Sequence, residues 1–144
     1  MRVFSNAAPQ IKKIPASAKA VLFVRNNKIL LLKKANGAWD LPGGKLKSGE
    51  GWIEGLTREV FEESGLRIRN ADWVSGWSNG RHPKKSMIMG FFVCQLNCKP
   101  KKSRIVISDE HVKGKFFSFN KVKGLALPQE YARVIKLAAQ KINP

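Results

Sequence analysis

Short apolar runs alternate with basic and glycine-containing segments along most of this chain. Runs rich in Val, Ile, Leu and Phe predict β-strands. They lie at residues 17–25, 28–33, 66–77 (as one or two strands), 86–96, 104–108 and 115–119. Asn26-Asn27 between the first two runs is a turn signal, so these runs predict a hairpin. Residues 86–96 are apolar on both faces, which predicts a central strand that is covered on both sides.

Two further segments have the periodicity of amphipathic helices. The first ends at Gly65, a typical helix stop, and the second begins at Pro128, which suits a first helical turn. At about 100° per residue, their apolar faces carry, respectively, Trp52, Ile53, Leu56 and Val60, and Tyr131, Val134, Ile135, Ala138 and Ile142. Residues 1–16 predict a loose arm or an edge strand, and residues 120–127 a turn or short helix. Strands with two clear helices predict an α+β fold with a mixed sheet.

The first helix carries an unusual group of carboxylates. Glu59, Glu62 and Glu63 share one flank of the helix, where like charges repel. The repulsion is stronger beside a core, because water screens it less well there. A Mg²⁺ ion would remove this conflict, since it prefers oxygen ligands and binds through a few carboxylates plus substrate phosphates. The alternative is a solvated helix in which Glu54, Arg58 and Glu62 form a ladder of ion pairs.

The residues around this helix follow a longer pattern. Five residues separate Gly44 from Glu50, and seven separate Glu50 from Arg58-Glu59-Val60. One residue then separates Val60 from Glu62-Glu63, and one separates Glu63 from Gly65-Leu66. This pattern resembles the complete signature of the Nudix hydrolase family, with every fixed position matched. The resemblance implies one domain over residues 1–144 with the fold of an α/β/α sandwich. It also implies Mg²⁺-dependent hydrolysis of a pyrophosphate bond in a nucleoside diphosphate linked to another group, nucleoside triphosphates included.

The same resemblance implies a set of metal ligands. The carboxylates of Glu59, Glu62 and Glu63 and the backbone carbonyl of Gly44 are expected to hold one or more Mg²⁺ ions, with Mn²⁺ as an alternative. A metal at these oxygens would polarise a bridging pyrophosphate and activate water near neutral pH. Lys47 departs from many relatives, which carry an acid at this position of the loop.

The candidate catalytic residues are Glu59, Arg58 and Glu110. The resemblance implies that Arg58 pairs with Glu50 and orients the carboxylates. The general base is open between Glu59 and Glu110, which is one of the few acids outside the helix and its loop. His111 is expected to be a surface histidine rather than a base.

The charge distribution favours a phosphate-rich substrate. The chain has 27 Lys and Arg against 10 Asp and Glu, a net charge of +17, and six of the acids lie between residues 39 and 66. A basic molecule around one acidic focus attracts polyanions. RNA 5′-pyrophosphohydrolysis or decapping and diphosphoinositol polyphosphate hydrolysis are therefore alternative functions. A module that binds nucleotides or RNA without cleaving them is a third, although the intact glutamates argue against it. The basic surface could equally serve only solubility.

Substrate contacts rest on weaker signals. Exposed cations in the predicted loops and hairpin could meet phosphates, and aromatic residues could stack on a base, although lysines on loops are usually solvated and aromatics usually core. The candidate cations are Arg25, Lys33, Lys34, Arg81, Lys84 and Lys85, and the candidate aromatics are Trp39, Trp77, Phe91 and Tyr131.

The remaining composition predicts a cytoplasmic protein without a membrane segment. No apolar run approaches the ~20 residues needed to span a bilayer, and the N-terminus lacks the apolar core of a signal peptide. Cys94 and Cys98 are expected to be buried free thiols. Monomer and homodimer are both compatible with the sequence.

Overall fold

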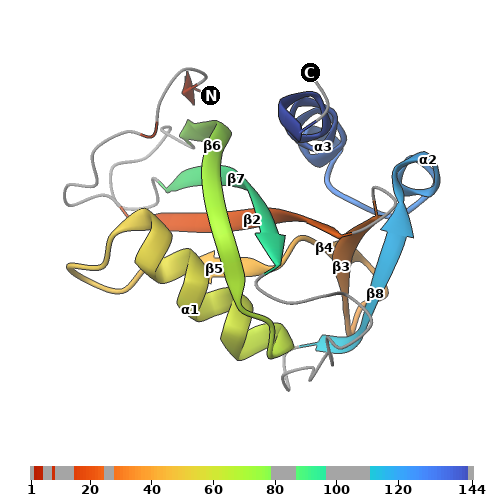
Figure 1. The fold of residues 1–144 in the computed structure, drawn as a ribbon, viewed down its shortest axis with the longest axis horizontal. Helices are drawn as coiled ribbons and strands as arrows, with labels where there is room; N and C mark the ends of the chain where they lie inside the picture. The colour runs from red at the N-terminus through yellow and green to blue at the C-terminus, as the bar shows by residue number, and fades with distance from the viewer. Residues whose placement is uncertain are drawn as a thin grey trace.

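A mixed β-sheet forms the centre of the molecule, with helices on both faces (Figure 1). The computed structural model describes residues 2–4 (backbone only), 8, 15–24, 28–78, 87–96 and 111–142. Its strands are β1 (Arg2–Phe4), β2 (Ala16–Val24), β3 (Lys28–Lys34), β4 (Trp39–Asp40), β5 (Gly43–Lys45), β6 (Ile68–Ser78), β7 (Ile88–Leu96) and β8 (His111–Ser118). Its helices are α1 (Trp52–Ser64), α2 (Phe119–Val122) and α3 (Gln129–Ile142).

The strand order places β2 at the middle of the fold. The order is β1-β6-β7-β2-β3-β4, with β5 also paired to β2 and β8 to β3. β2 and β7 are parallel, whereas the other pairs are antiparallel. Among the described residues, β2 and β3 pair through Phe23↔Ile29 and Val24↔Lys28, and the strands then separate. This opening lets the short strand β5 pair with the first half of β2.

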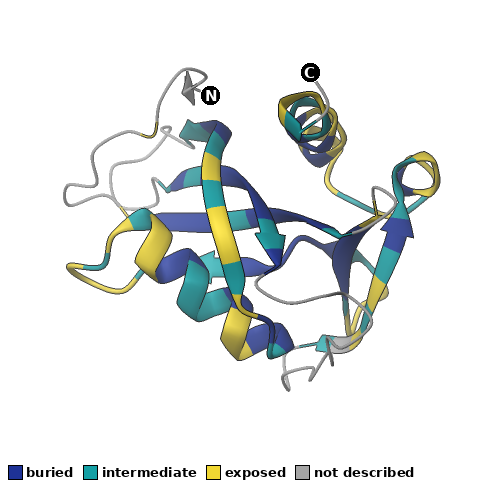
Figure 2. Ribbon diagram, in the orientation of Figure 1, coloured by how far each residue is buried: buried dark blue, intermediate teal, exposed yellow. Residues whose placement is uncertain are grey.

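Two apolar clusters hold the helices to the sheet. α3 contributes Tyr131, Val134, Ile135 and Ala138 to one cluster, together with Val21 and Phe23 of β2. α1 contributes Leu56 and Val60 to the other, which contains Ala18, Ala20 and Leu22 of β2. Alternate residues of one strand point to opposite faces, so β2 serves both clusters. Figure 2 shows this strand buried along most of its length.

The predicted elements are largely confirmed. The α+β fold, the mixed sheet and the α/β/α layers are present, and β7 lies between β6 and β2 as a central strand. Residues 66–77 give the single strand β6, and β1 is an edge strand paired with β6. Residues 120–127 include the last part of α2. The predicted strand at residues 104–108 lies outside the described residues.

One strand boundary and one position expected to be buried differ from the prediction. β8 begins at His111, four residues before the predicted strand, because it pairs along β3 as far as Lys34. Ile53 is 46% exposed although it was expected on the buried face of α1. The helical period fixes the angle at which Ile53 leaves α1. Whether other residues cover the first turn of the helix depends on tertiary packing.

The described residues also bear on the thiols and on the membrane. Cys94 is a buried free cysteine, as predicted, and burial raises its pKa. Cys98 lies outside the described residues. No described helix combines the length and apolar character needed to cross a bilayer.

Candidate active site

Strand β5 brings a glycine backbone directly against the carboxylates of α1. Gly43 has a φ of 136°, and a Cβ there would overlap the carbonyl oxygen of Ala18 in β2. A side chain is therefore excluded by both conformation and space. A Cβ on Gly44 would lie 2.6 Å from Oε2 of Glu59. Gly43 thus lets β5 lie close to β2, and Gly44 lets the Glu59 carboxylate lie close to the β5 backbone.

Arg58 is the centre of an ion-pair network beside this contact. Its Nε donates to Glu50 Oε2 at 2.7 Å, and its Nη2 donates to Glu50 Oε1 at 2.9 Å and to the Lys45 carbonyl at 3.1 Å. The hydrogen bonds from Arg58 hold the pKa of Glu50 down to about 2, and the Glu50 carboxylate in turn raises the pKa of Arg58. This two-pronged contact is the strong geometry of an arginine–carboxylate pair.

The same guanidinium also joins two of the predicted metal ligands. The other terminal nitrogen of Arg58, Nη1, lies 2.9 Å from Glu59 Oε1 and 3.0 Å from Glu62 Oε2. The two carboxylates therefore converge on one cation. The contact between Arg58 and Glu62 is one that the alternative of a solvated ion-pair ladder also predicts. The contacts of Arg58 with Glu50 and Glu59 are not part of that ladder.

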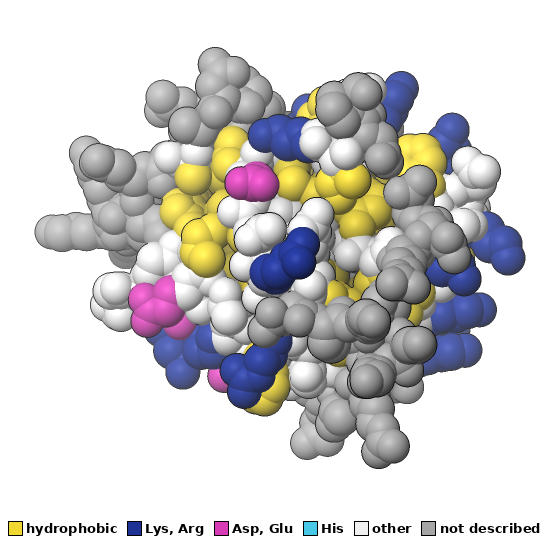
Figure 3. Space-filling model, in the orientation of Figure 1, with side chains coloured by type: hydrophobic (Ala, Val, Ile, Leu, Met, Phe, Trp, Pro, Cys, Tyr) yellow, Lys and Arg dark blue, Asp and Glu magenta, His cyan; other side chains and the backbone are white. Residues whose placement is uncertain are grey.

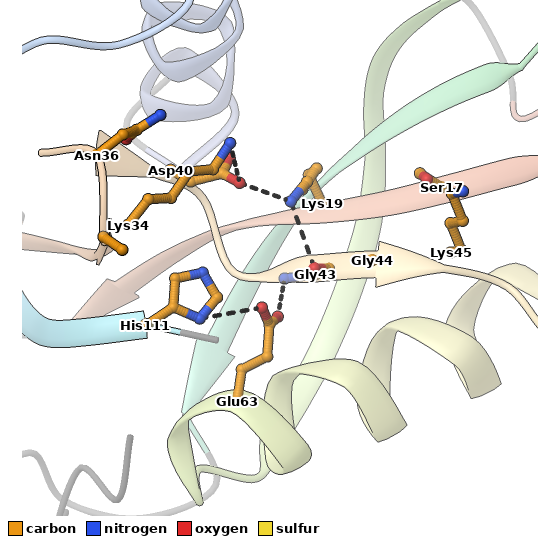
Figure 4. A pocket seen from close by; sticks show the side chains of 11 residues that line it. Ser17, Lys19, Lys34, Asn36, Asp40, Gly43, Gly44, Lys45, Glu63 and His111 are labelled. Atoms are coloured by element: carbon orange, nitrogen blue, oxygen red, sulfur yellow. Dashed lines mark hydrogen bonds and ion pairs between the residues drawn. The ribbon is translucent and has the colours of Figure 1, made fainter. Parts of the chain in front are cut away.

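Glu63 is positioned differently from its neighbours. Its side chain is buried, Oε1 accepts a hydrogen bond from the Gly43 N–H at 2.6 Å, and Oε2 lies 3.6 Å from Nδ1 of His111 (Figure 4). Burial raises the pKa of Glu63 to about 7. The side chain of His111 is only 6% exposed, so the expectation of a surface histidine is wrong. Pairing of β8 with β3 carries His111 inward, against α1.

A cavity of about 550 Å³ opens between these elements. Its walls come from β2, the β3–β4 turn, β5, α1 and β8. Three cationic side chains (Lys19, Lys34 and Lys45) and two carboxylates (Asp40 and Glu63) line it. A cavity of this kind, wide, polar and rich in lysine, suits a ligand with several phosphates.

Sequence reasoning missed one pair in this cavity. Lys19 Nζ lies 3.1 Å from Asp40 Oδ2 and 3.3 Å from the carbonyl oxygens of Leu41 and Gly43. Lys34 Nζ lies 3.6 Å from the same Asp40 oxygen. Lys19 thereby ties β2 to the segment that leads into the glycine loop. The available signal was a lone lysine inside the otherwise apolar run of β2.

The oxygen donors of α1 fit a hard divalent cation in their chemistry. Glu59 packs into the space that a Cβ on Gly44 would fill, and Glu62 shares the Arg58 contact. Glu63 turns instead to Gly43 and His111. Within the part of the chain that the structure describes, no three Asp, Glu, His or Cys side chains are gathered as a ready metal site. The arrangement joins Glu59 and Glu62 through Arg58 and gives Glu63 separate partners in β5 and β8.

The other predicted site residues divide into three groups. Glu110, Arg25, Arg81, Lys84 and Lys85 lie outside the described residues. Lys33 and Trp39 are described but do not line the cavity, whereas Lys34 does. Phe91 and Tyr131 are core residues and Trp77 stacks on Phe91 at 4.6 Å, which favours the structural alternative for all three.

Comparison with known proteins identifies the family. The model of the NUDIX domain matches residues 13–138. The chain belongs to the Nudix family. It is 31% identical over 127 residues to an ADP-ribose pyrophosphatase from Methanocaldococcus jannaschii, covering 85% of this chain and 72% of that protein. It is 33% identical over 85 residues to a MutT-like protein from Streptomyces ambofaciens, covering 58% of this chain and 51% of that one.

Solved structures agree with the Nudix assignment at the level of the fold. The MutT protein from Methanosarcina mazei Go1 superimposes with a TM-score of 0.68 at 24% identity, covering 94% of this chain and all of that one. An ADP-ribose pyrophosphatase from Streptococcus suis gives a TM-score of 0.69 at 22% identity, covering 90% and 92%. The chain is thus a Nudix pyrophosphohydrolase with an α+β sandwich fold, and the family generally uses a divalent metal.

Proposed function

We propose that this enzyme hydrolyses the pyrophosphate bond of a nucleoside diphosphate linked to another group, nucleoside triphosphates included, with Mg²⁺ as cofactor. The observation that carries the proposal is the cavity itself, which is lined by three lysines, by Glu63 and by Gly44, the glycine against which Glu59 packs. ADP-ribose, the substrate in the name of the archaeal relative, is a nucleoside diphosphate joined to a sugar and therefore belongs to this class.

Glu59, Glu62 and Glu63, with the Gly44 carbonyl, would hold the ion. When bound, Mg²⁺ or Mn²⁺ supplies a Lewis acid that neutralises phosphate charge and activates water. Arg58 has a positioning role, because it holds Glu59 and Glu62 to one side of α1. Glu59 and Glu110 are the candidate proton acceptors, and Glu59 is the one packed against the glycine backbone.

The lysines of the cavity have a separate task. Lys34 and Lys45 line the cavity and would bind the phosphates that are not in contact with the ion. Lys19 already donates hydrogen bonds to three protein oxygens. It would therefore fix the shape of the segment from Asp40 to Gly43 and would not bind the substrate directly. The neighbouring positive charges also stabilise the charge that develops on the leaving phosphate.

A substrate panel tests this proposal. ADP-ribose, nucleoside triphosphates, a 5′-triphosphorylated RNA and a diphosphoinositol polyphosphate would be incubated with and without Mg²⁺, and the products identified by mass spectrometry. We expect Mg²⁺-dependent cleavage of a P–O–P bond in a small nucleotide. Preferred cleavage of the RNA or of the inositol compound would instead support the alternatives that the net charge of +17 favours.

Two variants of α1 separate catalysis from binding. Glu63→Gln should lower kcat by roughly 100-fold or more, while Glu54→Gln, which changes an exposed acid on the same helix, should keep full activity. Nucleotide binding by the wild type without turnover of any panel member would contradict hydrolysis and support a binding module.

A further inference from the structure

Three lysines project from one face of the β3–β8 pair. Lys33 lies directly opposite Lys113, and Lys115 lies opposite Leu31, two positions farther along β8. Directly opposed residues point to the same face with Cβ atoms roughly 5 Å apart, and alternate residues of a strand are roughly 7 Å apart. Lys113 and Lys115 are exposed and Lys33 is partly exposed. We call these three residues the lysine surface.

Two of these ammonium groups rest on aromatic rings. Lys33 Nζ lies 5.7 Å from the ring centroid of Trp39, and Lys115 Nζ lies 5.3 Å from that of Phe117. The two rings contact each other edge to face at 4.8 Å. Such cation–π contacts hold the ammonium groups in place rather than leaving them free in solvent. Phe117 is buried, whereas Trp39 keeps part of its indole at the surface.

The lysine surface is electrostatically uncompensated. Like charges that face each other across strands destabilise the sheet. Within the described residues, no ion pair involves Lys33, Lys113 or Lys115, and Asp40, the acid of the neighbouring strand β4, pairs with Lys19 and Lys34 instead. Residues 111–142 as a whole carry seven Lys and Arg against the single acid Glu130. An external polyanion would remove this repulsion.

The lysine surface is separate from the catalytic cavity. Successive residues of a strand point to opposite faces, and Lys34, which follows Lys33, lines the cavity while Lys33 does not. Phe117 and Trp39 belong to the apolar cluster on the α3 side of the sheet. Figure 3 shows basic side chains along the edge of the molecule on the side of β8 and α2.

We propose that the lysine surface binds the phosphate backbone of single-stranded RNA, with one base stacked on the exposed part of Trp39. Proteins that bind single strands combine a positively charged track with aromatic side chains on which bases stack. Adjacent ammonium groups match successive phosphates, and the partly exposed indole beside Lys33 offers a flat apolar surface. An acidic protein segment would use the charges but has no planar group for Trp39. This function goes beyond hydrolysis and does not depend on it.

The test is the binding of a fluorescent single-stranded RNA with a 5′-hydroxyl, which offers no pyrophosphate to the cavity, measured by anisotropy in EDTA. Each phosphate contact contributes about 0.7 to the slope of log K against log salt. The triple variant Lys33→Gln, Lys113→Gln, Lys115→Gln should therefore lose about 2 units of slope and at least tenfold in affinity at low salt. Trp39→Leu should weaken binding roughly tenfold without changing the slope.

A charge-matched control removes three exposed cations elsewhere, by Lys28→Gln, Lys47→Gln and Arg67→Gln, and should keep most of the salt slope. Unfolding temperatures of all variants show whether each is folded. Equal losses in both triple variants, equal competition by poly-glutamate, or no binding of RNA by the wild type would each overturn the proposal. Glu63→Gln should bind this RNA like the wild type. A failure of the hydrolysis proposal would therefore not affect the RNA-binding result, and a failure to bind RNA would not affect the hydrolysis proposal.

Discussion

At the scale of single residues, Arg58 shows how the site is stable with so many acids close together. One guanidinium contacts Glu50, Glu59 and Glu62. Removing one partner of such a network leaves the remaining charges uncompensated, which costs more than the lost hydrogen bond itself. Among the described carboxylates, the pKa of Glu50 is lowered and that of Glu63 is raised, which gives opposite dependences of stability on pH.

Glu50 should stabilise the fold only above the acid range. Its pKa falls from an ordinary 4.5 to about 2 because Arg58 donates to its carboxylate. A lowered pKa gives stability that is complete above about pH 4.5 and is lost as the pH falls toward 2. Glu50→Gln should therefore lower the unfolding temperature at pH 6 by several degrees, and the difference from wild type should shrink toward pH 2. Thermal unfolding across this range checks it; a constant difference would contradict the pKa shift.

Glu63 should have the reverse effect in the absence of metal. Burial raises its pKa to about 7, so the folded state binds more protons than the unfolded state between about pH 4.5 and 7. Stability is then lost as the pH rises through this window and stays reduced above it. Glu63→Gln should raise the unfolding temperature in EDTA at pH 8, by about 4 °C for each kcal/mol of relief, but not at pH 4.

Added Mg²⁺ provides the control for the Glu63 prediction. It should raise the unfolding temperature of the wild type at pH 8, because ligands of the native state stabilise it, and should do so less in Glu63→Gln. An equal rise in both proteins would show that Glu63 is not a ligand.

At the scale of elements, strand β5 separates two roles of adjacent glycines. A Cβ on Gly43 would overlap backbone atoms of β2, whereas a Cβ on Gly44 would meet only the end of the Glu59 side chain. Backbone cannot move aside without breaking the β2–β5 pairing, but a carboxylate can. The first glycine therefore supports the fold, and the second supports the site.

Alanine substitutions test this division of roles. Gly44→Ala should change stability by less than about 1 kcal/mol, yet lower activity and Mn²⁺ affinity at least tenfold, since the Glu59 carboxylate is displaced. Gly43→Ala should cost about 3 kcal/mol or more. Gly51→Ala is the matched control, because its Cβ would meet nothing within 4 Å. Unfolding temperature, hydrolysis rate and metal titration distinguish the three variants; full activity in Gly44→Ala would remove the proposed role of that contact.

At the scale of the whole molecule, α1 is an acidic element in a strongly basic chain. α1 carries four glutamates and one arginine, whereas the chain as a whole has a net charge of +17. Such a field raises the encounter rate of anions with the protein, and salt screens it over a Debye length that falls from about 30 Å at 10 mM to about 8 Å at 150 mM.

Encounter with a nucleotide should therefore depend on ionic strength. Between about 10 and 150 mM NaCl, kcat/KM for the preferred nucleotide should fall several-fold while kcat changes little, because screening acts on approach and not on the chemical step. Steady-state kinetics at fixed free Mg²⁺ measures both. A salt-independent kcat/KM would show that the positive surface does not guide the substrate.

The sequence by itself determined the family, the α+β class and most strands and helices. These follow from local patterns, namely the fixed spacings of the signature from Gly44 to Leu66 and apolar periods of about 2 and 3.6 residues. It also placed Glu59, Glu62 and Glu63 on one flank of one helix, because neighbours within two turns of a helix have fixed angles. These conclusions required no knowledge of how distant segments pack.

Only the tertiary structure decided what those residues face. Lys19, Asp40 and His111 come from β2, β4 and β8 and meet at one cavity because β3 separates from β2 and pairs with β8 instead. The same packing gave Glu63 partners in β5 and β8, left Ile53 exposed, and set Lys33 opposite Lys113. The helical or strand period predicts the direction in which a side chain leaves the backbone. Which residue it meets there depends on how segments far apart in the chain pair, and a local sequence pattern does not contain that information.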